Sequence, residues 1–526
     1  MGPPAESLDI LNQRNRATQA RHLANRAQDA GSRILTALSD PLHAPRNVML
    51  AVIAYVLVWT SYAIVSTSLH DLHPDMTEEA VIARDWAFGY LKHPPMSVWV
   101  PGVWFTIFPP RAWAFYLLAM STAGVGLFSA WLLARRYLSI EKAAIALALL
   151  TFVPFYNFHA IRFNANSLQV ALWPVATLFF LRSLERQKIF DAVVAGILTA
   201  AALLTKYWAA FLILGFFAAA CVHPRRSQYF RSVAPWLSAL VAISLVAPHV
   251  HWLQAHDFWP LRYAAARGLV DQNRLLLVTK YIAASFAYVA AAIALAWWVR
   301  GAEGRPFRRT FRALSAEERS LAVLLLIPVL SPIALTLASG ANLNALWGMP
   351  AFALLPVVLL SPAGGPLVAW RAATIVLAAV LAPFVFAFMS PIAATAQAWA
   401  RPDPVNMLVL TDAVAAAWAP ESKPLRIVAG PEDFAFSTAF PLRTRPSAFP
   451  NQSYVWAPYL TEERVKREGM AIVCPAQHQH CVAGARERAS ITPGARTSEI
   501  SVEGGSFVRR IPPQPFLITI IPPGSE

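Results

Sequence analysis

The sequence predicts an all-α polytopic membrane protein with a small α/β domain at its C-terminus. Of its 526 residues, 57% are hydrophobic and only 14% are charged, which is unlike a soluble domain. Apolar segments recur through the first three quarters of the chain, and short basic clusters separate them, as in alternating membrane crossings. From about residue 395, polar residues return, and short apolar runs such as Leu425–Ala429, Ala471–Val473 and Phe516–Ile521 predict strands joined by Pro- and Gly-containing turns.

The net charge of +15 does not indicate a nucleic-acid-binding protein, because the basic residues lie in clusters between apolar runs. The sequence contains no GxGxxG, Walker, HExxH or Gly-x-Ser-x-Gly motif, so nucleotide-driven transport and serine hydrolysis have no support.

Residues 1–45 predict a cytoplasmic amphipathic arm. This segment is rich in arginine and contains no lysine, and its leucines recur at roughly helical spacing. We expect a helix that lies on the membrane surface. The arm is too long and too polar before the first apolar run to resemble a cleaved signal peptide.

Residues 46–394 predict about eleven membrane-spanning helices. The apolar spans lie near 48–67, 113–134, 143–157, 168–181, 190–205, 208–222, 233–248, 280–298, 320–338, 346–361 and 371–389. With the N-terminus inside, four successive inner loops are basic, as the positive-inside rule expects. The outer segments are then 68–112, 158–167, 206–207, 249–279 and 342–347, and the odd number of crossings places the polar domain, residues 395–526, on the same outer face.

The stretch from His70 to Pro95 is the first long polar segment and the best candidate for a catalytic loop. An acidic loop beside so much apolar sequence must stay hydrated. A hydrated acidic loop at a membrane surface is a candidate active site, because ionisable groups in such positions usually have a function. Transfer of a group to a hydroxyl needs a base, and we expect Asp75, partly desolvated and with a raised pKa, to serve as that base. Glu78 and Glu79 would support it or cap a helix. The alternative is a solvated acidic loop.

Several basic or aromatic polar residues are candidates for binding a phosphate. Lys92 and His93 precede two prolines that restrict the backbone, although snorkelling of Lys92 to the headgroups is an alternative. Lys206 and Tyr207 interrupt two apolar runs and would contact a lipid phosphate or mark the membrane interface.

The outer loop that begins near His249 leaves two interpretations open. His249 and His251, with Asp257 nearby, are ligand types for a divalent metal. The same residues, beside Trp252 and Trp259, are also typical of a membrane interface. His249 and Arg262 are further candidates for contact with a phosphate.

Three cysteines occur, at positions 221, 474 and 481. Cys221 ends an apolar run and is expected to be a small hydrophobic residue. Cys474 and Cys481 are close together in the polar domain, and a disulfide between them is expected if that domain lies outside the cytoplasm.

A set of short motifs resembles the GT-C glycosyltransferases of the protein mannosyltransferase-like group (families 39 and 83), and most closely the bacterial lipid A aminoarabinose and galacturonic acid transferases. The resemblance covers most of 45–475. The motifs, in chain order, are Asp75, Gly89-Tyr90-x-Lys92-His93-Pro94-Pro95, Phe163-Asn164-Ala165-Asn166, Leu204-Thr205-Lys206-Tyr207, Pro248-His249-x-His251-Trp252, Trp347-Gly348-Met349-Pro350, Ala457-Pro458-Tyr459 and Gly469-Met470-Ala471.

This resemblance implies an inverting transfer from a polyprenyl-phosphate sugar on the periplasmic face of a bacterial inner membrane. Asp75 would deprotonate the acceptor, and Tyr90, His93, Lys206 and Tyr207 would lie near the donor phosphate. Asn164 and Asn166 would support the site.

The chain departs from the family pattern at two places. Many relatives have Asp-Glu where this chain has Asp75-Met76, and relatives often have Glu-Lys-Pro-Pro where it has Lys92-His93-Pro94-Pro95. In the aminoarabinose enzymes that glutamate is a metal-ligand position, so Lys92 counts against a bound metal. The change from Lys to His is expected to alter the preferred sugar phosphate.

The expected partners are therefore a polyprenyl-phosphate-linked sugar, a glycolipid acceptor such as lipid A or the lipopolysaccharide core, and the bilayer itself. A protein O-glycosyltransferase of the same fold is the nearest alternative. A lipid-linked sugar transporter or flippase would need charged groups in the middle of its spans, and the predicted spans are nearly free of charge there. A sensor is a third class, but the sequence predicts no cytoplasmic signalling domain.

Overall fold

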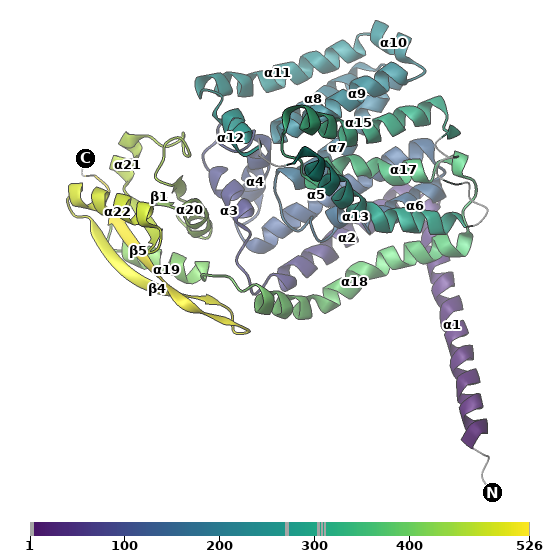
Figure 1. Cartoon of the computed structure of the whole chain (residues 1–526), viewed down its shortest axis with the longest axis horizontal. Coiled ribbons are helices and arrows are strands. Elements are labelled where there is room, and N and C mark those ends of the chain that lie inside the picture. Colours follow the sequence, from purple (N-terminus) through teal and green to yellow (C-terminus); the bar gives the residue numbers. More distant parts are fainter. Residues whose placement is uncertain (1–4, 269–272, 302–305, 307–308, 310–311, 525–526) are drawn as a thin grey trace.

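The computed structural model describes residues 5–524 except for 269–272, 302–305, 307–308 and 310–311. A large helical part adjoins a smaller part that contains a β-sheet, and a long N-terminal helix projects from the opposite side of the helical part (Figure 1). A helical membrane protein with a small α/β domain at its C-terminus was predicted, and this fold class is confirmed.

Seven helices are long and apolar enough to cross a membrane, among the residues that the structure describes. They are α2 (Ala44–Ser66), α5 (Ala112–Tyr137), α7 (Ala165–Arg186), α11 (Ala234–Ala255), α13 (Arg274–Arg300), α15 (Ala316–Ser339) and α18 (Ala369–Ala400). The protein is therefore a multi-pass membrane protein, because each of these helices is long and apolar enough to span the hydrocarbon region and satisfies its own backbone hydrogen bonds there.

The other four expected spans coincide with shorter helices. These are α6 (Ile140–Leu150), followed by the turn η1 (Pro154–Tyr156), α8 (Ile189–Thr205), η2 with α9 (Tyr207–Ala209 and Ala210–Val222), and the run of α16 (Ala345–Gly348), η3 (Met349–Leu354) and α17 (Leu355–Leu359). The total of eleven crossings stays a prediction. α18 continues to Ala400, so the expected domain boundary at 394/395 lies inside a helix.

The remaining helices of this part are short or lie at its edges. They are α1 (Ala5–Ser39), α3 (Pro74–Ile82), α4 (Met96–Ile107), α10 (Arg226–Arg231), α12 (Trp259–Gly268) and η4 (Pro362–Gly364). Leu35 and Leu38 near the end of α1 join the core of the helical part, whereas His22 to Gln28 are exposed. Residues 269–272 of the expected 249–279 loop lie outside the described residues.

The expected inner loops meet at one end of the helices. Arg136 forms an ion pair with Glu185, and Arg182 lies 2.8 Å from Asp191. Lys142 Nζ donates to the carbonyl of Gly365 at 3.0 Å, and Arg371 donates to that of Trp298 at 2.8 Å. Each contact joins two segments that the alternation of spans places on the same face, so these basic clusters pair with carboxylates and helix ends at that face.

The C-terminal domain is built on a five-stranded sheet with the order β2-β1-β3-β5-β4. Its elements are α19 (Met407–Trp418), β1 (Ile427–Gly430), α20 (Glu432–Ala439), β2 (Ser447–Pro450), α21 (Glu462–Glu468), β3 (Met470–Pro475), α22 (Gln479–Ile491), β4 (Arg496–Gly505) and β5 (Arg510–Ile521). β1 pairs in parallel with both β2 and β3, while β5 is antiparallel to β3 and β4. The three strands predicted from the sequence lie in β1, β3 and β5.

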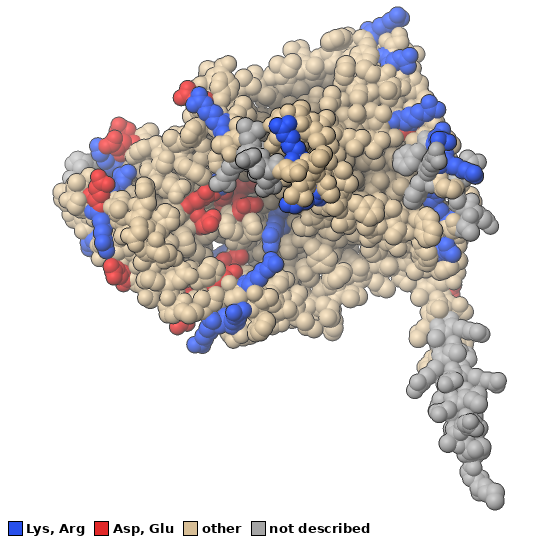
Figure 2. Space-filling model, viewed as in Figure 1, with Lys and Arg blue, Asp and Glu red and all other residues tan. Residues whose placement is uncertain are grey.

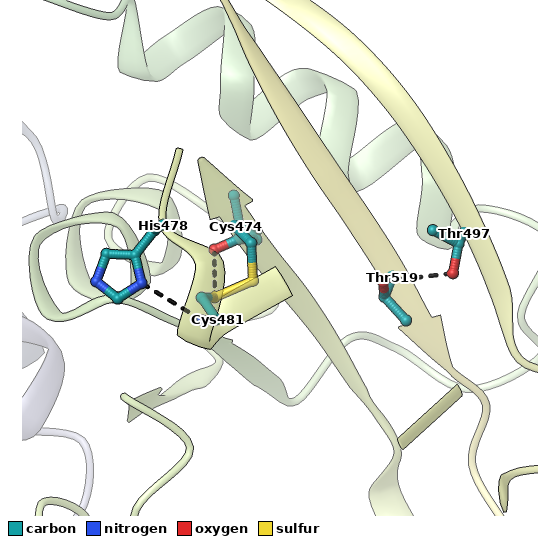
Figure 3. The surroundings of a disulfide bond; sticks show 6 residues. Cys474, His478, Cys481, Thr497 and Thr519 are labelled. Carbon is teal, nitrogen blue, oxygen red and sulfur yellow. Dashed lines mark hydrogen bonds between the residues drawn. A yellow bond between two sulfur atoms is a disulfide. The ribbon is translucent and has the colours of Figure 1, made fainter. Parts of the chain in front are cut away.

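A disulfide joins Cys474, at the end of β3, to Cys481 in the first turn of α22 (Figure 3). The two Cα atoms are 5.6 Å apart, a usual separation for this bond. His478 caps the start of the helix, since its Nδ1 accepts from the backbone N–H of Cys481. The disulfide therefore fixes the helix to the end of a central strand.

The first outer loop and the C-terminal domain share one hydrophobic core. Met76, Val81 and Phe105 of the loop belong to the same buried cluster as Phe436 and Ile518 of the sheet domain. α3 and α4 are too short to be stable by themselves, so their apolar faces depend on this contact. The loop that was predicted as a separate polar segment is therefore folded together with residues far away in the sequence.

Arg84 anchors this joint. Its guanidinium group reaches into the C-terminal domain and donates to three backbone carbonyls, of Ala439 at 3.0 Å, Phe440 at 2.9 Å and Pro446 at 2.6 Å. A second contact, between Arg464 and Asp85, has a length of 3.0 Å. The bonds from Arg84 satisfy carbonyls at and after the end of α20, which would otherwise be buried without donors.

We expect Arg84→Met to loosen the joint, because it leaves carbonyls without a donor, each at a cost of about 1–3 kcal/mol. Hydrogen exchange of residues 434–450 in the purified protein should become faster, while the membrane helices stay protected. Arg443→Met, at a neighbouring exposed position, is the control and should leave exchange unchanged. Equal protection in both variants would show that Arg84 does not hold the two parts together.

Candidate functional site

Asp75 lies in the first turn of α3, at the surface of the first outer loop. His73 caps the helix and accepts from the backbone N–H of Asp75, and Pro74 occupies the first helical position, both usual features of a helix start. The Asp75 side chain is 53% exposed, and its carboxylate is 3.8 Å from His73 Nδ1. The expected desolvation of this carboxylate is absent from the structure, so Asp75 is open to an incoming molecule.

The buried acid of this helix is Glu79, one turn after Asp75. Glu79 is only 2% exposed, and one of its carboxylate oxygens has no hydrogen-bond partner among the described residues. Burial raises the pKa of Glu79 well above its usual range, and the nearby carboxylates of Glu78 and Asp75 raise it further. The environment of Glu79 therefore favours its uncharged form.

Lys92 is held between two carboxylates from distant parts of the chain. Its ammonium group lies 2.9 Å from Glu78 of α3 and forms a second ion pair with Glu432 at the start of α20. The indole ring of Trp456 lies 5.5 Å away. All three ion-paired side chains are largely buried, so Lys92 faces protein and does not snorkel toward headgroups.

The loop that carries Lys92 is closed by Tyr90. The Tyr90 hydroxyl donates to the carbonyl of Asp85 at 3.1 Å and accepts from the N–H of Ala87 at 3.0 Å. Its ring is buried. The polar tip expected to lie near a phosphate is therefore used to shape the loop.

His93 follows Lys92 and is partly buried. Burial, together with the positive charges of Lys206 and Lys92, lowers the pKa of His93 to about 3. The imidazole is therefore neutral at physiological pH, and it can donate one hydrogen bond but adds no positive charge.

Lys206 lies between α8 and η2, where it contacts the start of α7. Its ammonium donates to Asn166 Oδ1 at 2.6 Å and lies 4.6 Å from the centre of the Trp347 ring. Asn164 has a different task, since its side chain caps α7 by accepting from the N–H groups of Asn166 and Ser167. Of the two asparagines, one shapes the helix start and the other directs Lys206.

Tyr207 and His249 form a short hydrogen-bonded chain that ends on the first outer loop. Tyr207 Oη lies 3.0 Å from His249 Nε2, and His249 Nδ1 lies 2.6 Å from the carbonyl of Phe88. The carbonyl can only accept, so Nδ1 carries the proton and Nε2 accepts from the tyrosine. The chain links η2, α11 and the loop that carries Lys92.

These contacts do not suit His249 to a metal. Both of its ring nitrogens are occupied by protein partners, and His251 lines a different, apolar surface of α11. In the described part of the chain, no group of three or more His, Cys, Asp and Glu side chains is arranged to hold a metal ion.

Arg262 is not brought into the cluster. It lies exposed on α12, and the described structure records no side-chain contact between Arg262 and the other predicted site residues. By contrast, Glu432 and Trp456 reach Lys92 from the C-terminal domain, and neither was predicted from the sequence. Glu432 follows closely after the carboxyl end of the parallel strand β1, an edge where α/β domains commonly place functional residues. This position in the sequence is the one feature that could have predicted Glu432 as a site residue.

An apolar groove of about 700 Å³ runs along the membrane helices α8, α9 and α11. Phe217, Phe230 and Ile243 line it nearer the inner end, and His251 and Gln254 line it at the outer end. α11 also carries His249, so the outer end of the groove approaches the hydrogen-bonded chain that contains Tyr207.

A second cavity of about 720 Å³, with charged as well as apolar residues in its lining, lies between the first outer loop, the outer end of α18 and the C-terminal domain. His73, Pro74 and Met76, the residues that flank Asp75 at the start of α3, line it. Acidic and basic residues gather where the helical part meets the sheet domain, and the surface is hollowed there (Figure 2).

Comparisons with known proteins agree with this architecture. Residues 92–252 match the family model described as dolichyl-phosphate-mannose-protein mannosyltransferase. A crystal structure of ArnT from Cupriavidus metallidurans bound to undecaprenyl phosphate superposes on this chain with a TM-score of 0.56 at 12% sequence identity. The match covers 90% of this chain and 97% of the ArnT chain. The apo structure of the same protein gives a TM-score of 0.55 at 11% identity over the same shares. A search of curated protein sequences found no match.

The class defined by this fold is a multi-pass membrane protein with the GT-C glycosyltransferase architecture. Within that class, the family match over residues 92–252 and the fold shared with ArnT agree with the predicted resemblance to the protein mannosyltransferase-like group.

Gly89 permits the close approach of the first outer loop to α11. A Cβ atom at this position would overlap the Trp252 ring, and Trp252 is itself stacked on His256. We expect Gly89→Ala to push the loop away from α11 and to weaken the bond between His249 and Phe88, at a cost of about 1–3 kcal/mol. Hydrogen exchange of residues 85–95 should become faster.

Gly484→Ala in α22 is the matched control for Gly89→Ala. A Cβ there meets only the side-chain nitrogen of Gln452, at 3.4 Å, so exchange should stay unchanged. A second variant, Gly89→Ala with Trp252→Leu, provides space for the methyl group and should restore part of the protection. If Gly89→Ala alone leaves residues 85–95 as protected as before, the close packing does not position this loop.

Proposed function

We propose that the chain is an inverting glycosyltransferase that moves a sugar from a polyprenyl-phosphate donor to a cell-envelope acceptor, such as lipid A or the lipopolysaccharide core. The reaction takes place on the periplasmic face of a bacterial inner membrane, with the N-terminus in the cytoplasm. Asp75 is the base, Lys206 contacts the donor phosphate with His93, Tyr207 and His249 near it, and Lys92 positions the loop.

The observation that carries this proposal is an apolar groove on helices whose outer ends carry Lys206 and the Tyr207–His249 pair. The groove on α8, α9 and α11 offers about 700 Å³ of apolar space, which suits a polyprenyl chain. Lys206 and the Tyr207–His249 pair lie at the outer ends of the same helices. ArnT, which shares the fold, contains undecaprenyl phosphate in one of its crystal structures.

In the proposed reaction, the acceptor hydroxyl gives its proton to the Asp75 carboxylate while its oxygen attacks the anomeric carbon of the donor sugar. The bond between that carbon and the phosphate oxygen breaks, and the polyprenyl phosphate leaves with the electron pair. An exposed carboxylate can reach the hydroxyl, and general-base assistance of this kind typically accelerates a reaction by about 10² to 10⁴.

Lys206 is placed to stabilise the negative charge that develops on the leaving phosphate. The only hydrogen-bond partner recorded for its ammonium group among the described residues is the neutral Asn166, so no carboxylate has to be displaced. Lys92 differs, because Glu78 and Glu432 already neutralise it. We therefore assign Lys206 the direct electrostatic task and Lys92 the task of positioning the loop.

The chemistry of the C-terminal domain supports the assigned side of the membrane. The Cys474–Cys481 disulfide is a kind of bond that persists in the periplasm and is rare in the bacterial cytoplasm. This favours a periplasmic domain, and the first outer loop shares its core and therefore its compartment.

Asp75→Asn tests the proposed base. Among the described residues, Asp75 has a recorded side-chain ion pair only with its neighbour His73, so the protein should insert and fold normally. We expect the rate of sugar transfer to fall by at least about 10²-fold. In cells whose only copy of this protein is the variant, mass spectrometry should then show the disappearance of one sugar mass from one glycolipid.

Asp412→Asn, on the exposed face of α19, controls for the loss of an acidic group from the same outer surface and should retain activity. If every glycolipid mass persists when Asp75→Asn is present at normal levels, Asp75 is not the base for a glycolipid acceptor. A loss confined to a glycoprotein would instead support the protein O-glycosyltransferase of the same fold.

The three cysteines provide a test of the compartment. Cys221 in α9 is a free, exposed cysteine. Denatured protein from cells should therefore bind one maleimide-polyethylene glycol unit without reduction and three units after reduction. Cys221→Ser lowers these numbers to none and two. Three labelled cysteines before reduction would contradict both the disulfide and the periplasmic location of the domain.

A further inference from the structure

The hairpin formed by β4 and β5 extends away from the rest of the sheet domain and returns to the membrane helices. Its two long strands run to the outer end of α18, where their connecting turn lies (Figure 1). Backbone hydrogen bonds fix it there, since the N–H of Gly505 donates to the carbonyl of Asp403 at 2.7 Å and the N–H of Asn406 donates to that of Glu503 at 3.1 Å. The turn therefore has a defined place beside the segment that leaves α18.

Arg509 joins this turn to α18 directly. Its guanidinium group donates to the backbone carbonyl of Trp399 at 2.8 Å and lies 5.7 Å from the centre of the Trp399 ring. Because α18 is one of the helices long and apolar enough to cross a membrane, the turn of the hairpin contacts the end of a membrane-spanning segment.

The end of α18 that meets the hairpin carries an exposed apolar stripe. Phe388, Ile392 and Trp399 are all exposed, and their spacing of four and then seven residues places them on one face of the helix. With 32 residues, α18 is about 48 Å long, close to the thickness of about 40–45 Å of a bilayer with its headgroups. Trp399 therefore lies at the level of the outer headgroups, where tryptophan side chains are enriched.

Phe507 extends this stripe beyond the end of the helix. It lies in the turn between β4 and β5, two residues before Arg509, and is 80% exposed. Exposure alone would mean little, since Ile491 at the end of α22 is exposed to a similar degree. What distinguishes Phe507 is its place next to Trp399, at the end of a helix whose exposed face meets lipid.

Positive charge surrounds these aromatic side chains. Arg401 and Arg510 are exposed, and the described structure records no ion pair or side-chain hydrogen bond for either of them, while Arg509 binds only a neutral carbonyl. Of the nearby carboxylates, Asp403 already accepts two hydrogen bonds from the first outer loop, and Glu503 is exposed. Three guanidinium groups therefore outnumber the carboxylates, and basic side chains are visible on this side of the joint (Figure 2).

We propose that the turn of the β4–β5 hairpin and the outer end of α18 form a membrane-docking surface that binds anionic phospholipids. Phe507 and Trp399 insert among the headgroups and the upper parts of the acyl chains, as aromatic side chains do at membrane interfaces. The three arginines bind the phosphates of anionic headgroups. The proposal goes beyond the proposed function, because it assigns the sheet domain a direct attachment to the bilayer.

The test replaces Phe507 by benzoylphenylalanine, a photo-crosslinking amino acid that keeps an aromatic ring. Full-length protein is placed in nanodiscs made of equal amounts of phosphatidylcholine and anionic phosphatidylglycerol and is illuminated, and mass spectrometry of its peptides identifies what becomes attached. The control carries benzoylphenylalanine in place of Ile491, because α22 packs on the sheet face opposite to the one that supports the first outer loop. We expect at least about tenfold more phospholipid attached at position 507 than at position 491.

The identity of the attached lipid tests the role of the arginines. Phosphatidylglycerol should exceed phosphatidylcholine by about threefold at position 507, and Arg510→Gln or about 1 M salt should lower this ratio toward one. Total attachment of lipid should persist in both cases, since the aromatic side chains remain. Arg486→Gln, on α22 and loosely paired with Glu499, is the matched control and should leave the ratio unchanged.

Equal attachment of lipid at positions 507 and 491 would overturn the docking surface, and so would attachment at 507 mainly to a second copy of the chain. Equal amounts of the two phospholipids in the Arg510-containing protein would overturn the selection of anionic headgroups. None of these measurements depends on sugar transfer, so a failure of the proposed function leaves the result of this test unchanged.

Discussion

The burial of apolar side chains between the first outer loop and the C-terminal domain is the constraint on which the candidate site depends. α3 and α4 are both short, and helices of their length do not stay folded in water without a partner. Met76 and Phe105 instead pack in one cluster with Phe436 and Ile518. The three carbonyls bound by Arg84 complete the joint, because they gain donors where α20 ends. Asp75 and Lys92 owe their positions to this contact.

The joint also explains the two different environments of the lysines. Lys92 lies at the seam between the two parts, where carboxylates from both sides neutralise its charge. Lys206 lies among membrane helices, with an amide and an indole ring as its neighbours. A cation that is already paired gives little to a substrate phosphate, whereas one held by neutral groups has no carboxylate to release before it binds a phosphate. In the proposed function, the same residue type therefore positions the loop in one place and stabilises charge in the other.

Hydropathy was sufficient to predict the helical segments, because the bilayer imposes a length and an apolar composition that can be counted directly. It also placed Lys206 and His249 on one face. The sequence could not reveal that Glu432 meets Lys92, since these residues are far apart in the chain and no local pattern encodes the contact. The prediction also assigned the buried environment to the wrong acid. Asp75 and Glu79 are one turn apart, and only the packing of α3 decides that Glu79 faces the core while Asp75 stays in solvent.

The order of the strands has a consequence for biosynthesis. β5 (Arg510–Ile521) lies between β3 and β4, and its Phe516 and Ile518 belong to the core that supports the first outer loop. A ribosome completes that loop early and that strand last. The apolar side of the loop therefore stays unpaired until β5 has been made. Assembly of the site is thus a late event that only a chain extending to the last strand can reach, so an interrupted product would insert into the membrane without acquiring it.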